Sequence, residues 1–547
     1  MKKNKFFSLL CAIMSLVIVM SVVALSSSAE DEMLKKSIKK IATIDAADND
    51  AATSYEWYDH GYTPNITAVQ NPDGTYCLCV VMRDGSLSII ELNADYSVKN
   101  TVSVPAQLSC FVSFCKGTDG TYYVLFNQTL TVDTRNSTAL RLVNIDTDGE
   151  VIRSLELSGM ASGSWLGVAS INCGNNAMTA NGKYLTAYIA RDMFPVKQNP
   201  ITGKDEFTES GTVHQSSYAF AVDLENFTLV EVETATAIPY ASHSFHQMIL
   251  KDGNNFVYVD RGDAEPERAY HITKMSGDLQ WKEQNEADSF IFKGDYADNN
   301  TYGQLGGIIR SGDKYMLVGS YENTTSSTDP SAANIFVQMF DAATLTPSDE
   351  FYLTSYTGIE DEDTGVDTVT NPKVIRANEN YVLIPYMLSN HILHTEEMHV
   401  ILADNNGEVI WDKTAEANSG DPVLPRYGQV YFDTDTQSVV WFRIVKGELV
   451  VNSVKINLPA DEPDSDESTT DEVTIVPSSP TEPESTAPTQ STTVESSDVN
   501  PTVPEITTAR PETTTQQPEP EEPELSLWDK IVNFFIGIYN FFVSLFN

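Results

Sequence analysis

The chain is short of positive charge. Of its 547 residues, 34 are Lys or Arg and 77 are Asp or Glu, which gives a formal net charge of −43 at pH 7. Residues 30–457 alone hold 29 basic and 59 acidic residues, so the acidity is not confined to a tail. Such a surface repels nucleic acid and other anionic polymers. We therefore expect no nucleic-acid partner, whereas cationic partners, calcium and neutral glycans stay open.

Cysteine is scarce as well, with 6 residues in the chain. Cys11 lies in an apolar N-terminal stretch, and no pair among the other five has the Cys-x-x-Cys spacing of zinc or redox sites. Cys77 and Cys79 are two apart in an expected strand, so both should point to one side and pack as small apolar residues. A disulfide between the first two repeat units is the alternative, and buried thiols are favoured.

Familiar catalytic motifs are missing too. The chain has no Gly-x-Ser-x-Gly elbow, no His-Glu-x-x-His, no P-loop and no Ser-x-Asp-x-Gly-x-x-Trp box. The acidic stretch 360–367 is rich in oxygen ligands but lacks EF-hand spacing. Arg261-Gly262-Asp263 matches an integrin-type tripeptide and is more simply a turn. We expect no cofactor, and the spacing of the acidic and histidine residues pairs none of them for catalysis.

What the sequence does contain is a hairpin that recurs seven times. Its clearest copy, 119–126, is an Asp-Gly turn followed by aromatic residues and a continuous apolar strand. The residue that opens this strand recurs at intervals of 46 to 72 residues, at Tyr76, Tyr122, Tyr184, Phe256, Tyr315, Tyr381 and Val439. A second hairpin follows in most units, which gives four strands each. Such a period is typical of propeller blades, and strands apolar on both faces suit sheets packed on either side. We predict an all-β fold, a seven-bladed β-propeller over residues 30–457.

The seventh unit is one strand short. Residues 428–456 supply three strands, and residues 38–44 could supply the missing outer strand and so close the ring. The strand–Asp-x-x-Gly–strand units resemble the blades of secreted bacterial propellers, including quinoprotein-like and arylsulfotransferase-like ones. That resemblance implies the fold. It implies no functional residue, because the tryptophan-docking motif of the quinoprotein group is absent.

Both ends of the chain predict export and attachment. Residues 1–29 have three lysines, an apolar stretch and small residues, as in a secretory signal peptide. Residues 458–524 hold 12 of the 25 prolines, with many Thr, Ser and Glu, and predict a disordered linker. Residues 525–547 have the spacing of an amphipathic helix that lies on a membrane surface or docks on a partner; a self-associating tail is the alternative. This layout is similar to that of some secreted bacterial surface proteins. We expect a secreted, extracellular or cell-surface location.

Loop lengths indicate which end of the ring carries the function. Turns after the first and third strands of each unit are tight, whereas connections after the second and fourth strands, such as 191–216 and 415–428, are long. These long connections share one face, where function normally concentrates. The candidate ligand-binding residues on this face are His60, Trp165, His214, His243, His246, Arg261, Tyr302, His391, His394 and Arg426.

Three functions are compatible with this pattern. The sequence favours a module that binds an extracellular protein or glycan through the long-loop face. One alternative is a secreted hydrolase, lyase or transferase with a histidine-lined axial site, where converging imidazoles could hold a transition metal. The other is a structural envelope protein without a ligand.

Overall fold

The computed structural model describes residues 33–46, 65–128, 138–158, 174–193, 196–198, 205–207, 214–230, 246–262, 269–279, 286–289, 303–322, 332–356, 367–390, 393, 395–416 and 424–459. The chain divides into two units, Met1–Asp461 and Glu462–Asn547. The second unit lies outside the described residues. So do the predicted signal peptide, the predicted C-terminal helix and all but the first residues of the predicted linker.

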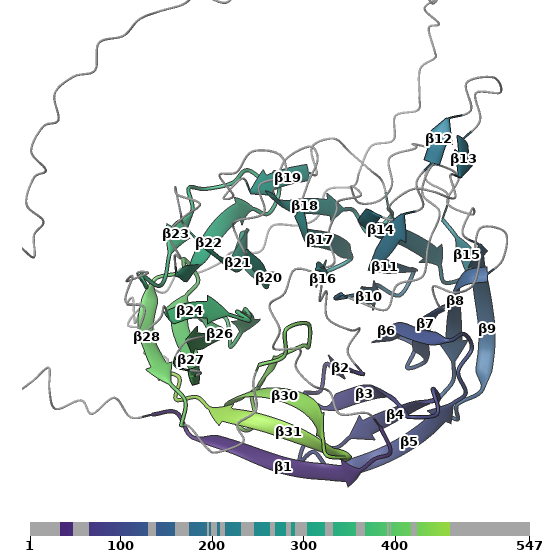
Figure 1. The fold of residues 1–547 in the computed structure, drawn as a ribbon, viewed down its shortest axis with the longest axis horizontal. Helices are drawn as coiled ribbons and strands as arrows, with labels where there is room; N and C mark the ends of the chain where they lie inside the picture. The colour runs from purple at the N-terminus through teal and green to yellow at the C-terminus, as the bar shows by residue number, and fades with distance from the viewer. Residues whose placement is uncertain are drawn as a thin grey trace, which may run out of the picture. The chain divides into compact units, whose positions relative to one another are not determined.

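The first unit is a ring of seven antiparallel sheets, as predicted (Figure 1). Blades one and two consist of β2 (Ile66–Gln70), β3 (Tyr76–Val81), β4 (Leu87–Leu92) and β5 (Val98–Val104), then β6 (Cys110–Lys116), β7 (Tyr122–Asn127), β8 (Thr138–Ile145) and β9 (Val151–Ser158). Blades three and four consist of β10 (Ala177–Ala180), β11 (Tyr184–Met193), β14 (His214–Asp223) and β15 (Thr228–Leu229), then β16 (Gln247–Asp252), β17 (Asn255–Gly262), β18 (Ala269–Met275) and β19 (Glu286–Ser289).

The remaining strands complete the ring. Blade five consists of β20 (Gln304–Ser311), β21 (Lys314–Glu322), β22 (Ala333–Asp341) and β23 (Phe351–Tyr352). Blade six consists of β24 (Asp367–Thr370), β25 (Ile375–Arg376), β26 (Tyr381–Asn390), β27 (Thr395–Asp404) and β28 (Val409–Thr414). Blade seven consists of β29 (Tyr431–Asp433), β30 (Ser438–Val445), β31 (Glu448–Lys455) and β1 (Lys36–Thr43). A separate hairpin is formed by β12 (Val196–Gln198) and β13 (Asp205–Phe207). Within the described residues there is no helix, and hence none long and apolar enough to cross a membrane.

The N-terminal strand closes the ring, as the sequence predicts. β1 pairs antiparallel with β31 along the outer edge of blade seven, with Lys36 opposite Val454 (Figure 1). The residues on either side of β1 contact both neighbouring blades: Leu34 bridges to Ala415 after β28, and Ala46 bridges to Met82 after β3. Residues 33–46 thus contact three blades, namely six, seven and one.

Turn chemistry explains where the strands of each hairpin begin. In blade two, Oδ1 of Asp119 accepts hydrogen bonds from the backbone N of Thr121 at 3.1 Å and from its hydroxyl at 2.8 Å. Gly120 between them has a φ of 85°, which disfavours any residue with a side chain. The chain reverses here, and β7 begins at Tyr122.

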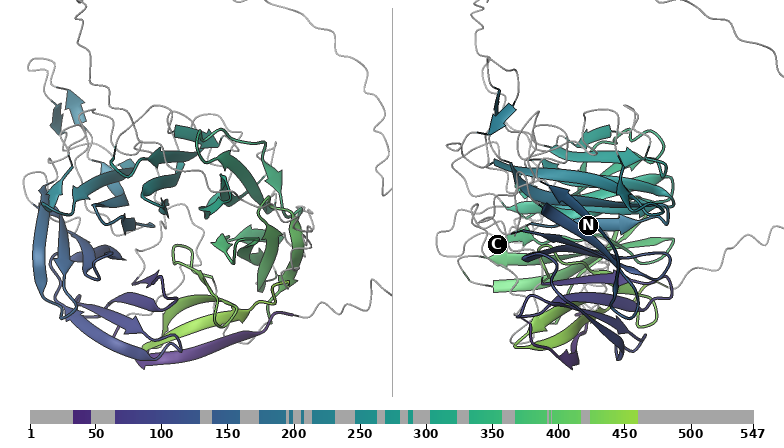
Figure 2. Two further views of the ribbon diagram at one scale, coloured as in Figure 1. Left: turned by 180° about the vertical axis from the view of Figure 1, so that it is seen from behind. Right: turned by 90° about the vertical axis from the view of Figure 1, so that its right-hand side faces the viewer.

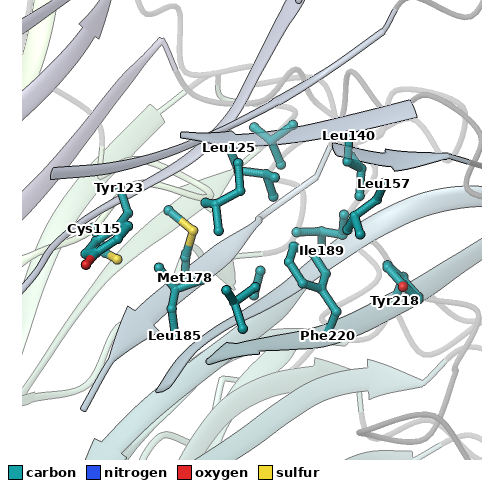
Figure 3. Packing of buried hydrophobic residues seen from close by; sticks show 14 of the residues in the cluster. Cys115, Tyr123, Leu125, Leu140, Leu157, Met178, Leu185, Ile189, Tyr218 and Phe220 are labelled. Atoms are coloured by element: carbon teal, nitrogen blue, oxygen red, sulfur yellow. The ribbon is translucent and has the colours of Figure 1, made fainter. Parts of the chain in front are cut away.

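Seven apolar clusters hold the ring together, one at each seam between neighbouring blades. Alternate side chains of one strand enter different clusters: Tyr76, Leu78 and Val80 pack toward blade seven, and Cys77 and Cys79 toward blade two. The two-residue period of a strand produces this division. Figure 3 shows the seam between blades two and three, where side chains of β7 and β8 meet those of β11 and β14.

The cysteine prediction is confirmed where the structure describes it. Cys77, Cys79 and Cys115 are free thiols in the interior. Burial, together with the nearby charge of Glu91, raises the pKa of the Cys77 thiol to about 12. These thiols therefore act as packing groups. Cys173 lies outside the described residues.

Polar clasps reinforce two of the seams at the tight-turn end. Between blades one and two, the hydroxyl of Tyr122 donates to Oε1 of Glu91 at 2.9 Å, and Nζ of Lys116 meets the same oxygen at 2.6 Å. The same arrangement recurs between blades four and five, where the carboxylate, cation and tyrosine are Asp252, Arg310 and Tyr315. Each clasp joins a carboxylate of one blade to the first two strands of the next.

Candidate functional site

The structure describes the side chains of three of the predicted ligand-binding residues, namely His246, Arg261 and Arg426. His214 was predicted in a loop, but it is the first residue of β14, opposite Met193, because this strand pair extends further than its polar sequence suggests. Its side chain is not among those described. The others lie outside the described residues: His60, Trp165, His243, Tyr302, His391 and His394.

The three described candidates lie near one another at the long-loop end of the ring. His246 immediately precedes β16, the inner strand of blade four, and its carbonyl accepts a hydrogen bond from the backbone N of Arg261 at 3.4 Å. Arg426 belongs to the segment 424–430 that leads into β29 of blade seven. A fourth basic residue joins them, Lys373, from a break in the inner strand of blade six. We refer to His246, Arg261, Lys373 and Arg426 as the axial cluster.

Segment 424–428 brings the cluster together by reaching across the ring. The ring of Tyr427 packs edge-on against that of His246, with centroids 5.1 Å apart and planes at 79°. Nζ of Lys373 donates to the carbonyl of Arg426 at 2.7 Å. Nδ2 of Asn371 donates to the carbonyl of Leu424 at 3.2 Å. Because blades four and seven stand on opposite sides of a seven-bladed ring, this segment crosses the ring axis; the ring viewed from behind and from the side is shown in Figure 2.

The break in blade six places Lys373 inside the ring. β24 and β25 both pair with β26, and residues 371–374 between them interrupt the inner strand. Asn371 has a φ of 50°, and Pro372 has no backbone N–H to donate. The inner strand of blade five approaches closely here, because a Cβ on Gly306 would lie 3.2 Å from the carbonyl oxygen of Pro372. Lys373 is consequently only 4% exposed.

Burial and like charge shape the protonation of this cluster. Burial, followed by the charge of Arg426, lowers the pKa of Lys373 to about 7. Burial, followed by the charges of Lys373, Arg426 and Arg261, holds the pKa of His246 well below its ordinary value. At neutral pH the uncharged form of His246 is therefore favoured, and Lys373 titrates.

The cluster differs from the two polar clasps at the tight-turn end of the ring. Lys116 and Arg310 each meet a carboxylate, at 2.6 and 3.0 Å. Among the described residues, no carboxylate forms an ion pair with Lys373 or Arg261. A concentration of positive charge thus lies at the axis of an otherwise acidic ring. Such a group attracts one anion at short range, within the screening distance of about 8 Å at physiological salt.

Sequence reasoning missed Lys373 and Tyr427. The long-loop face that loop length selected includes the segment that holds Tyr427. Loop length does not show which loop crosses the ring axis. The available signal for Lys373 was Asn-Pro-Lys, because a proline interrupts the backbone pairing of a strand. The described residues contain no group of three or more His, Cys, Asp or Glu placed to hold a metal ion. A metal bound by the other predicted histidines stays a prediction.

A hollow lies at the opposite end of the ring, between blades two and three. Its volume is about 310 Å³, and its lining includes Asp119, Arg153, Lys183 and Glu225. The charges there are mixed, and the guanidinium of Arg153 already donates to the carbonyl of Leu224 at 2.7 Å. The axial cluster is the stronger candidate because its buried lysine has no acidic partner among the described side chains.

Comparison with known proteins identifies no family. No protein-family model matches the chain, and no curated protein matches it. Among solved structures, the chain is similar to the GH93 α-L-arabinofuranosidase of Fusarium graminearum, at 11% identity and a TM-score of 0.35 over 63% of this chain and 92% of that one. It is also similar to cobalt-substituted Synechocystis apocarotenoid oxygenase, at 9% identity and a TM-score of 0.34 over 70% and 79%. The β-1,2-mannobiose phosphorylase of Listeria innocua gives 12% and 0.28 over 52% and 89%. Similarities this low carry no information about activity.

Proposed function

We propose that this protein is an exported, cell-surface propeller that binds an extracellular glycan or protein through its long-loop face, with the axial cluster receiving an anionic group of the ligand. The observation that carries the proposal is the convergence of four basic side chains from blades four, six and seven in a ring with 30 more acidic than basic residues. The surrounding negative field disfavours a polyanion. The ligand therefore carries few charges and presents one of them at the axis.

A glycan and peptide array tests this proposal. The full-length secreted chain should bind a subset of the array, and Arg426→Ala or Arg261→Ala should weaken that binding about tenfold or more, as expected when one charge-assisted hydrogen bond is lost. Lys314→Ala makes the same charge change at an exposed position in the tight-turn face. This control should bind like the wild type. An array without any bound ligand would refute a binding function.

The same proposal gives the C-terminal regions a role. In this proposal residues 458–524 serve as an acidic stalk, and residues 525–547 attach it to a membrane surface or a partner. A chain that lacks residues 525–547 should appear in the medium, whereas the intact chain fractionates with cells. Equal fractionation of the two chains would count against attachment.

An enzyme is the second candidate, and one observation favours it. A lysine with a pKa of about 7 is partly unprotonated at neutral pH and can accept a proton from a substrate. A hydrolase, lyase or transferase with an axial site would use Lys373 or the uncharged His246 in this way. Turnover of any glycan or ester in a substrate panel that disappears in His246→Ala, with the fold retained, would replace the binding proposal with this one.

A further inference from the structure

We infer that the axial cluster binds the carboxylate of a sugar acid at the end of a glycan chain and takes up a proton on Lys373 as it does so. This inference rests on the binding function proposed above. It adds the chemical class of the ligand and a pH dependence that the proposed function does not require.

The first step concerns the buried amine. Lys373 is 4% exposed, and the one hydrogen bond that its Nζ makes in the described part of the ring goes to the carbonyl of Arg426 at 2.7 Å. A buried ammonium without a counterion is unfavourable, and the group responds by losing its proton at a lower pH. Hence the pKa of Lys373 falls to about 7, which leaves the site incompletely charged in the absence of ligand.

The second step concerns what surrounds this amine. Arg426 approaches it from the crossing segment, and His246 and Arg261 lie on the side of blade four. Blade five contributes Gln304, a neutral amide whose Oε1 accepts a hydrogen bond from the backbone N of Asn371 at 2.7 Å. These neighbours are cationic or neutral.

The nearest described acid in sequence to Arg261 is its neighbour Asp260. Its carboxylate accepts a hydrogen bond from the hydroxyl of Tyr188 at 2.5 Å, in the seam between blades three and four. This carboxylate is therefore engaged with the neighbouring blade and makes no ion pair with Lys373. A ligand carboxylate would supply the counterion that Lys373 lacks among the described side chains.

The third step is linkage. A carboxylate bound beside Lys373 stabilises the ammonium form and raises its pKa above the value in the free protein. Binding is then strongest below the pKa of the free state, near 7, and weakens as pH rises above it. The apparent dissociation constant should increase roughly tenfold per pH unit between pH 7.5 and 8.5, and the complex should take up close to one proton there.

The fourth step selects the ligand. The buried amine of Lys373 lies between the inner strand of blade six and the segment 424–428, so the end of a chain reaches it more easily than the middle. A polymer with an acid on every residue would be repelled by the ring. The partly exposed ring of Tyr427 is a group that suits the C–H face of a sugar. These features favour a terminal sugar acid over a peptide C-terminus.

Calorimetric titration of the full-length secreted chain tests the inference. Glucuronic acid and a neutral oligosaccharide ending in glucuronic acid are compared with glucose and with an acetylated dipeptide that has a free C-terminus. Each is titrated between pH 6 and 8.5, in two buffers of different ionisation enthalpy, which gives the proton uptake. The two acidic sugars should bind with the pH dependence given above, and glucose should bind at least tenfold more weakly.

Variants of Lys373 separate this mechanism from simple attraction. Lys373→Arg keeps its charge over this range, so its binding should lose the pH dependence. Lys373→Met should bind weakly at every pH, and Lys314→Met should behave like the wild type. Thermal melts verify that each variant folds. Sugar-acid binding without proton uptake, a pH dependence that persists in Lys373→Arg, or tighter binding of the dipeptide would overturn the inference alone. Only failure of the whole glycan and peptide array would overturn the proposed function with it.

Discussion

At the scale of single residues, Glu91 shows how a polar group is kept at a seam between apolar blades. Its side chain is 17% exposed and receives hydrogen bonds from Lys116 and Tyr122. Burial acts to raise the pKa of this carboxyl, but the bonds from Lys116 and Tyr122 and the charge of Lys116 outweigh it, and the pKa is lowered. The ionised form is therefore favoured by the folded state.

This shift predicts a pH dependence of stability. Because the folded pKa of Glu91 is below its ordinary value of 4.5, its contribution is fully present above that pH and is lost as pH falls through the folded pKa. The difference in unfolding free energy between the wild type and Glu91→Gln should be largest near pH 6 and shrink below about pH 4.5. Urea unfolding across this range measures it. A difference in unfolding free energy that grows on acidification would contradict a stabilising role of ionised Glu91. Glu150→Gln, at a solvent-exposed turn, serves as the control.

At the scale of elements, β1 is the strand on which closure depends. It covers the edge of β31 through seven paired positions, and the residues on either side of it bridge to blades six and one. An uncovered β31 would present unpaired N–H and C=O groups, which promote association between chains.

Removal of residues 33–46 should therefore do more than lower stability. We expect an unfolding free energy reduced by an amount comparable with the ~5–15 kcal/mol of a typical domain, and soluble aggregates visible by light scattering. A synthetic peptide of residues 33–46 should restore the monomer, whereas a scrambled peptide should not. A monomeric truncated chain with an unchanged melting temperature would contradict this role of β1.

Strand positions were largely predictable at this scale, and the axial cluster only in part. Closure by residues near 38–44 followed from counting strands in the last unit, and the repeated turns located each hairpin. His246, Arg261 and Arg426 could be assigned to one face because strand order determines the side on which each loop emerges. Lys373 could not, since its burial depends on contacts between inner strands and a segment from another blade, which no local pattern encodes.

At the scale of the whole molecule, net charge is the dominant property. A formal charge of −43 at pH 7 destabilises a compact state through self-repulsion, and dissolved salt screens it. The screening length falls from about 10 Å at 0.1 M to about 3 Å at 1 M.

The melting temperature should accordingly rise by several degrees between 0.05 and 0.5 M NaCl, as followed by calorimetry. KCl should give the same curve, because screening depends on ionic strength and not on the cation. A rise that requires millimolar calcium and not sodium would indicate a specific cation site instead. A fall with NaCl would show that attractive ion pairs outweigh the repulsion.

The way β31 is placed has a mechanical consequence. This last strand of the ring lies between β30 and β1, so it is hydrogen-bonded along both sides. A pulling force applied through the residues after 459 acts along the length of β31. The hydrogen bonds from β31 to β30 and to β1 then bear this force together. Tension between the two chain ends would act differently, because Lys36 lies opposite Val454 at one end of the β1–β31 pairing. The hydrogen bonds between these two strands would then break one pair after another. A ring pulled only from its C-terminal side thus resists as a doubly flanked strand under shear.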